Sequence, residues 1–61
     1  MQTSFTDLTG ATINVIVNRN PLQNNYVAFV QIQDKWAMMG DGFNANEALH
    51  DAEVQWNLNL E

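Results

Sequence analysis

The absence of cysteine is the feature that most restricts how this 61-residue chain can be stabilised. A chain of this length buries only about 60% of the surface that it exposes when unfolded, so small domains usually need a disulfide, a metal or a second subunit. Disulfides are excluded here, and the commonest zinc ligand is missing. Hydrophobic residues make up 46% of the chain, which is enough for a folded core. We therefore expect one small domain over residues 1–61 that forms a homodimer.

The charges divide the chain into a neutral part and an acidic part. Seven acidic residues against two basic ones give a net charge of -5, all of which falls in residues 34–61. Neutralising nucleic-acid phosphates takes several basic side chains on one face, which Arg19 and Lys35 alone cannot supply. Direct binding to nucleic acid or to an anionic membrane is therefore disfavoured, whereas a basic protein would be attracted.

The N-terminal residues show neither the basic segment nor the apolar segment of a secretory signal. No apolar run approaches the ~20 residues that a helix needs to cross a bilayer. From both observations we expect a cytoplasmic protein.

Alternating apolar residues predict β-strands in the first half of the chain. Residues 12–18 place Ile13, Val15 and Val17 on one face of a half-buried strand. Residues 26–33 form a second strand, whose even-numbered apolar residues share one face while its odd-numbered residues share the other.

The connections predict an antiparallel meander of three strands. Residues 18–25 form a turn-rich loop that contains the only proline. Residues 34–35 have the length of a tight hairpin turn, and a third strand follows over residues 36–39. We expect the glycines of segment 40–42 to end this strand. Segment 2–9 is left open as an extension or an additional strand.

The last third of the chain predicts one amphipathic helix. Asn44 is a favourable N-cap, Glu47 completes a capping box three residues later, and Phe43 is placed for a hydrophobic staple. An apolar stripe then recurs at helical spacing. It consists of Ala45, Ala48, Leu49, Ala52 and Trp56. The predicted fold class is α+β, a three-stranded antiparallel meander with one C-terminal helix packed on one face.

No residues are arranged as a catalytic, metal or cofactor site. Glu47 and His50 share a helix face as an E-x-x-H pair, but a metal site needs a third protein ligand, and no second histidine or cysteine exists. We therefore interpret His50 as a solvated surface histidine. A calcium loop starting at Asp41 lacks the required oxygen ligands, and Ser4 has no nucleophile elbow around it. We expect no enzyme activity and no cofactor.

The outer face of the helix is the predicted partner-binding surface. At 100° per residue, two acidic and two apolar side chains fall opposite the core stripe, with a histidine at the edge. These residues are Glu47, Asp51, Val54, Leu58 and His50. An apolar pair with a rim of carboxylates is typical of a small protein-binding patch. An unprotected edge strand that recruits another strand is the rival contact.

Segment 40–49, which reads Gly-Asp-Gly-Phe-Asn-Ala-Asn-Glu-Ala-Leu, resembles the helix start of the HicB family of antitoxins. Segment 26–30 is similar to the central strand of that family, and the resemblance covers about residues 12–58. It implies a non-catalytic, dimerising domain that neutralises a basic, RNA-cleaving toxin. Segment 34–36 departs from the Pro-containing link of the family. Its DNA-binding segment is also missing after residue 58, so autoregulatory DNA binding is not expected.

Three functional hypotheses follow. The first is a binding module that occludes a basic protein, either as an antitoxin or as an inhibitor borne by a phage or mobile element. The second is a self-associating structural protein, and the third is a cryptic enzyme or ligand-binding domain. Capture of a basic partner should weaken steeply with salt, whereas apolar self-association should not.

Overall fold

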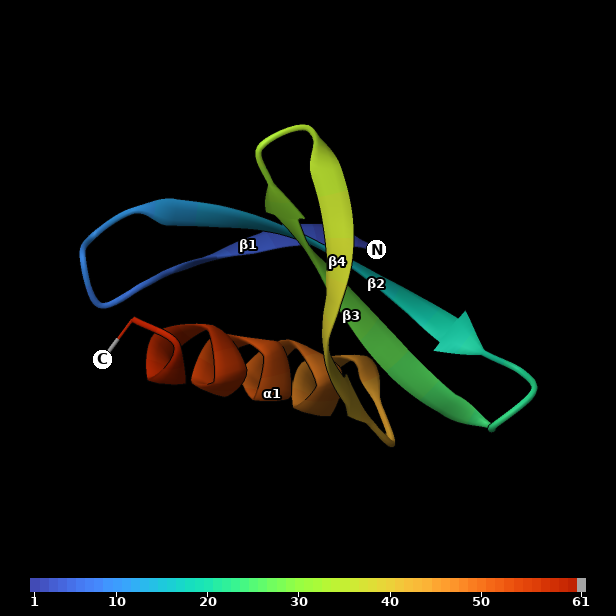
Figure 1. The fold of residues 1–61 in the computed structure, drawn as a ribbon. Helices are drawn as coiled ribbons and strands as arrows, with labels where there is room; N and C mark the ends of the chain where they lie inside the picture. Colours follow the sequence, from blue (N-terminus) through green and yellow to red (C-terminus); the bar gives the residue numbers. More distant parts are fainter. Residues whose placement is uncertain (61) are drawn as a thin grey trace.

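A four-stranded antiparallel sheet and one C-terminal helix form the fold (Figure 1). The computed structural model describes residues 1–60. The elements are β1 (Gln2–Thr6), β2 (Thr12–Asn20), β3 (Asn25–Ile32), β4 (Lys35–Gly42) and α1 (Ala45–Leu58). Neighbours in the sheet follow the chain order, so the topology is a simple meander. The α+β class is confirmed, but the prediction of three strands is wrong.

The additional strand is β1, which pairs with β2 from Gln2 opposite Ile16 to Thr6 opposite Thr12. Its sequence is almost entirely polar, and only Phe5 is buried. An edge strand that contributes one large apolar side chain to the core carries a weak alternation signal. Pairing with the strongly apolar β2 therefore decides the conformation of this segment.

Two connections differ from the expected boundaries. The strand β2 continues to Asn20, so that the loop before β3 shortens to residues 21–24. The turn between β3 and β4 occupies residues 33–34 because Ile32 pairs with Lys35. Gln33 has a positive φ of 57°, the left-handed conformation that tight hairpins demand of a turn residue.

The strand β4 ends at Gly42, within the predicted segment 40–42, but it continues through Gly40 and Asp41 instead of ending at Met39. Ala28 pairs with Gly40 and Phe29 pairs with Met38, so Met39 is the extra residue of a β-bulge. The bulge places Met39 and Gly40 consecutively on the helix side of the sheet. A Cβ atom on Gly40 would lie 2.4 Å from the backbone nitrogen of Ala52. Glycine therefore allows the helix backbone to lie directly against the strand.

The start of α1 follows the predicted capping with two differences. The side chain of Asn44 accepts a hydrogen bond from the Glu47 backbone N–H at 2.9 Å, as expected of an N-cap. The Glu47 carboxylate, however, accepts from the N–H of Phe43 at 3.0 Å instead of closing on the cap residue. Phe43 is 85% exposed, so the predicted staple does not form. Its expected partner, Ala48, is already covered by β4.

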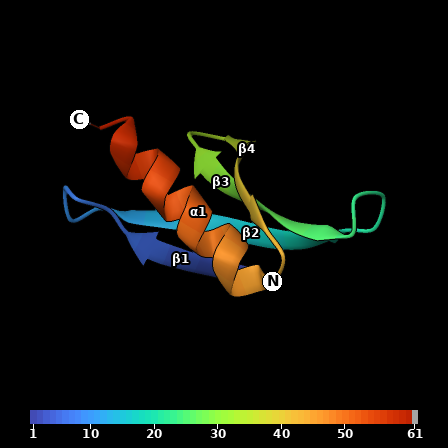
Figure 2. The same cartoon turned by 90° about the horizontal axis from the view of Figure 1, so that it is seen from below.

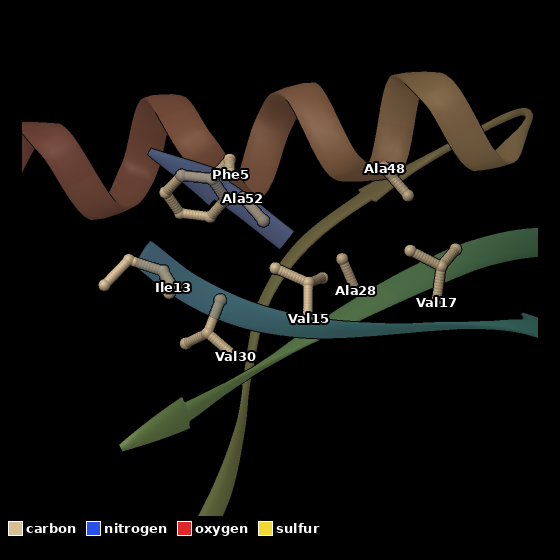
Figure 3. Close-up of a cluster of buried hydrophobic side chains, with 8 residues drawn as sticks. All are labelled: Phe5, Ile13, Val15, Val17, Ala28, Val30, Ala48 and Ala52. Carbon is tan, nitrogen blue, oxygen red and sulfur yellow. The ribbon is translucent and has the colours of Figure 1, made fainter. Parts of the chain in front are cut away.

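The core lies between α1 and one face of the sheet (Figures 2 and 3). It consists of Phe5, Ile13, Val15, Val17, Ala28, Val30, Ala48 and Ala52. Most of these side chains are small, which suits the close approach of helix and sheet. None of the elements formed by residues 1–60 covers the opposite face of the sheet.

Candidate functional site

The outer face of α1 carries all five side chains of the predicted partner-binding surface. Val54 is 39% exposed, Leu58 is 56% exposed, and His50 and Glu47 are also open to solvent. Asp51 is half-buried, because the helix lies close to the end of β4 on this side. The helix ends at Leu58, which points away from the core.

A shallow groove of about 420 Å³ runs along the first three turns of this face. It is lined by one apolar residue, Val54, and by the polar or charged residues Asn44, Asn46, Glu47, His50 and Asp51. The structure thus brings four of the five predicted residues into one depression. Leu58 lies about one turn beyond Val54 and does not line the groove.

The two acidic residues of the groove also hold the chain between β4 and α1. Glu47 accepts a hydrogen bond from the backbone of Phe43, and Asp51 Oδ2 accepts one from the backbone N–H of Asp41 at 2.9 Å. The second bond caps a donor of the edge strand β4, which blunts this edge against further strands. Each carboxylate is therefore oriented by one backbone donor of the same chain.

The charge of this face is not balanced within the helix. Three acidic residues lie in α1, which contains neither lysine nor arginine. The basic residues lie elsewhere: Arg19 donates to the Asn24 side chain at 2.9 Å, and Lys35 opens β4 beside the hairpin turn. The outer face of α1 therefore carries a negative potential.

His50 does not belong to a metal-binding cluster of the described residues. Within residues 1–60, no group of three or more His, Cys, Asp or Glu side chains is placed to hold a metal ion. The only helix of this part of the chain, α1, has 14 residues and is neither long nor apolar enough to cross a membrane.

A buried carboxylate that the sequence analysis missed joins the helix to the first hairpin. Asp7 is 8% exposed, and its Oδ1 accepts from the Thr9 hydroxyl at 2.6 Å and from the backbone N–H groups of Thr9 and Ala11. Its Oδ2 accepts from the Trp56 indole at 2.9 Å. The bonds from Thr9 and Trp56 are the main reasons why the pKa of Asp7 falls from 3.8 to about 2.

The donors around Asp7 come from the β1–β2 loop and from α1, so the carboxylate joins these two segments. Close by, the backbone N–H of Leu8 donates to Asn57 at 3.1 Å. Together these bonds fix the C-terminal end of α1 over the β1–β2 loop (Figure 1). The sequence signal was the segment Asp7-x-Thr9, which is typical of an Asx turn.

A second surface was also missed. The face of the sheet opposite α1 carries Trp36 and Met38, which are 42% and 64% exposed. The pattern of the sequence does not distinguish aromatic residues of the core from those of an interface. The structure places Trp56 against the core and Trp36 outside it.

Comparisons with known proteins add no relative. No protein-family model matches the chain, and neither the curated proteins nor the solved structures contain a match.

Proposed function

We propose that this chain is a non-catalytic protein-binding module that contacts a basic surface of another protein through the outer face of α1. One observation carries the proposal: the groove places the exposed Val54 beside two carboxylates that each accept a backbone hydrogen bond, on a helix without lysine or arginine. Protein interfaces combine an apolar centre and a polar rim in the same way.

The oriented carboxylates favour this function energetically. Ordering a flexible side chain on binding costs about 0.5–1.5 kcal/mol. Glu47 and Asp51 are already oriented by backbone donors, so less of this cost remains for a partner to overcome. A lysine or arginine of the partner can approach the free lone pairs of these carboxylates, while an apolar side chain contacts Val54. Long-range attraction between the acidic helix and a basic partner accelerates the encounter.

Among basic partners, proteins that process nucleic acids are the class that we favour. Their substrate-binding surfaces are basic because they must neutralise phosphates. An acidic module that covers such a surface acts as an inhibitor or antitoxin, which is also the function implied by the resemblance to HicB antitoxins over residues 12–58. The absence of cysteine suits action in the reducing cytoplasm.

Site-specific photo-crosslinking in the native host tests the proposal. A photoreactive amino acid replaces Val54 in one variant and Leu22, which is 94% exposed and lies outside the groove, in the control. We expect a basic protein to be crosslinked from position 54 only.

The same crosslink is then measured in two charge-matched variants. Asp51→Asn removes one negative charge from the groove but keeps an oxygen that can accept from Asp41, whereas Asp34→Asn removes one charge from the distant turn. The crosslink should weaken with Asp51→Asn and with added salt, and should persist with Asp34→Asn. Equal crosslinking from positions 22 and 54, or no effect of Asp51→Asn, would refute the proposal.

A further inference from the structure

The sheet face opposite α1 carries a continuous apolar row across its three longest strands. Ile16 pairs with Phe29, and Phe29 pairs with Met38, so these three side chains stand side by side on the same face. Ile16 and Phe29 are half-buried by their neighbours, while Met38 is 64% exposed. In Figure 2, α1 lies in front of the sheet, so this face is turned away from the viewer. This surface, the open face, is therefore left without a covering layer.

Trp36 projects from the open face and borders two hollows. It lies two residues from Met38 on β4 and lines a hollow of about 260 Å³ together with Ile16, Asn18 and Phe29. It also borders a second hollow, of about 300 Å³, whose other walls include Asn14 and Gln31. A projecting aromatic side chain next to a hollow with an apolar floor is a knob beside a hole.

The open face is nearly free of charge, although the molecule carries a net charge of -5. Of the strand positions that alternate onto this face, only Asp41 is charged, and it lies near the end of β4. The face holds no lysine or arginine to attract phosphates or anionic lipid headgroups. A highly basic partner likewise finds little attraction here, in contrast to the helix side.

We infer that the open face binds the open face of a second copy of this chain, forming a two-fold symmetric sandwich of two sheets. In a two-fold interface each copy offers the same patch, so a patch with both a knob and a hole can complement itself. Trp36 of each copy would then enter the hollow beside Ile16 and Phe29 of the other copy. Aromatic residues and methionine are the side chains that such interface centres favour.

The charge distribution permits this association. Two packed sheets lie ~10 Å apart, and a helix layer adds roughly 10 Å on each side, so the two acidic helices would be roughly 30 Å apart. The Debye length at physiological ionic strength is only about 8 Å. Repulsion between the helices is therefore largely screened, and both partner-binding grooves remain accessible.

The available area fits a modest dimer. With four strands spaced ~4.8 Å apart and up to eight or nine residues long at ~3.3 Å each, the face measures roughly 500 Å² in projection. Two such faces bury roughly 1,000 Å², the lower limit for a specific interface. We therefore expect a dimer that dissociates on dilution within the micromolar range.

Sedimentation velocity of the full chain over a roughly hundredfold range of concentration tests the inference. The wild type should shift from monomer to dimer. Met38→Lys adds a charge at the centre of the open face at an exposed position and should remain monomeric at every concentration. Leu22→Lys adds the same charge to an apolar residue outside the face that is even more exposed than Met38, and it should dimerise like the wild type.

Two further variants keep the test decisive. Trp36→Ser changes a side chain that is 42% exposed and should also be monomeric. This variant replaces Met38→Lys in the test if circular dichroism shows that Met38→Lys does not fold. Asp51→Asn on the helix side should still dimerise, so that failure of the dimer and failure of the proposed helix-side function are read separately. A wild type that stays monomeric at all concentrations, or dimers that survive both Met38→Lys and Trp36→Ser, would overturn the inference.

Discussion

Replacing Gly40 by alanine tests the contact between β4 and α1 on which the arrangement of both surfaces depends. The new Cβ would lie 2.4 Å from the backbone nitrogen of Ala52, 2.8 Å from the carbonyl oxygen of Ala48 and 2.9 Å from the Cα of Ala52. Normal contact requires about 3.5 Å, so helix and strand must separate by about 1 Å. All three contacting atoms belong to backbone, which no rotamer change can move aside.

The expected cost is a large part of the stability of so small a domain. Overpacking of this kind costs about 1–3 kcal/mol, and we expect the upper half of that range because Ala48 and Ala52 are fully buried. A 61-residue domain has a free energy of unfolding of roughly 3–9 kcal/mol. A loss of about 2–3 kcal/mol lowers the melting temperature by roughly 10–20 °C.

Thermal and urea unfolding, followed by circular dichroism at one protein concentration, measure this effect. Gly10→Ala is the control, since Gly10 has a φ of 87° with no atom within 4 Å of an added Cβ, and its cost should be limited to about 1 kcal/mol of backbone strain. Adding Ala52→Gly to Gly40→Ala should not restore stability, because the contacts are made by backbone atoms. A Gly40→Ala chain as stable as the wild type would show that the helix does not lie this close to β4.

Three further predictions concern single residues. Asp7→Asn should lower the melting temperature near neutral pH. Because the pKa of Asp7 is lowered on folding, the difference from the wild type should shrink as the pH falls from about 4 to about 2. A constant difference in melting temperature across this pH window would contradict the role of the carboxylate. Gln33→Gly should raise the free energy of urea unfolding by about 0.5 kcal/mol, because glycine adopts the left-handed conformation without strain. The same change at Asn24, which has a φ of 54°, should raise the free energy of unfolding less, because asparagine tolerates this region. Equal increases for both variants would refute this reasoning. Asn44→Ala should cost about 1 kcal/mol in the same assay and Asn44→Asp much less, and similar losses for both would show that the cap bond to Glu47 contributes little.

Much of the fold could be predicted because two signals in the sequence are local. The alternation in β2 and β3 follows from burial of one face, and the cap at Asn44 followed by an Ala-rich stripe defines the helix. The strand β1 could not be predicted, since its conformation depends on pairing with β2 and its only buried apolar residue is Phe5.

The role of the glycines in β4 was equally hidden. Glycine in a sequence indicates either a break or a close approach, and only the position of α1 decides between them. The bulge at Met39 then fixes which side chains of β4 face the helix. Small residues such as Ala28 and Gly40 end up beneath α1, and the large ones, Phe29 and Trp36, remain on the open face.

The helix-side surface could be predicted from the 100° spacing, because the outer face follows directly from the core stripe. The role of its two carboxylates in holding the chain between β4 and α1 could not be predicted. The backbone hydrogen bonds of Glu47 and Asp51 depend on where β4 ends relative to α1, a contact between segments that periodicity does not describe. The open face escaped the analysis because β3 has apolar residues on both sides, so that neither face stands out from the sequence.

Hydroxyl-radical footprinting of the wild-type chain tests most directly whether the open face self-associates while the outer face of α1 stays free. It is performed at one concentration at which we expect the monomer and at one at which we expect the dimer. We predict that Trp36 and Met38 become protected as the concentration rises, while His50 and Leu58 on the helix side are modified at the same rate throughout. Equal modification of Trp36 and Met38 at both concentrations, or protection of His50 and Leu58 in their place, would contradict the assignment of self-association to the sheet and of partner binding to the helix.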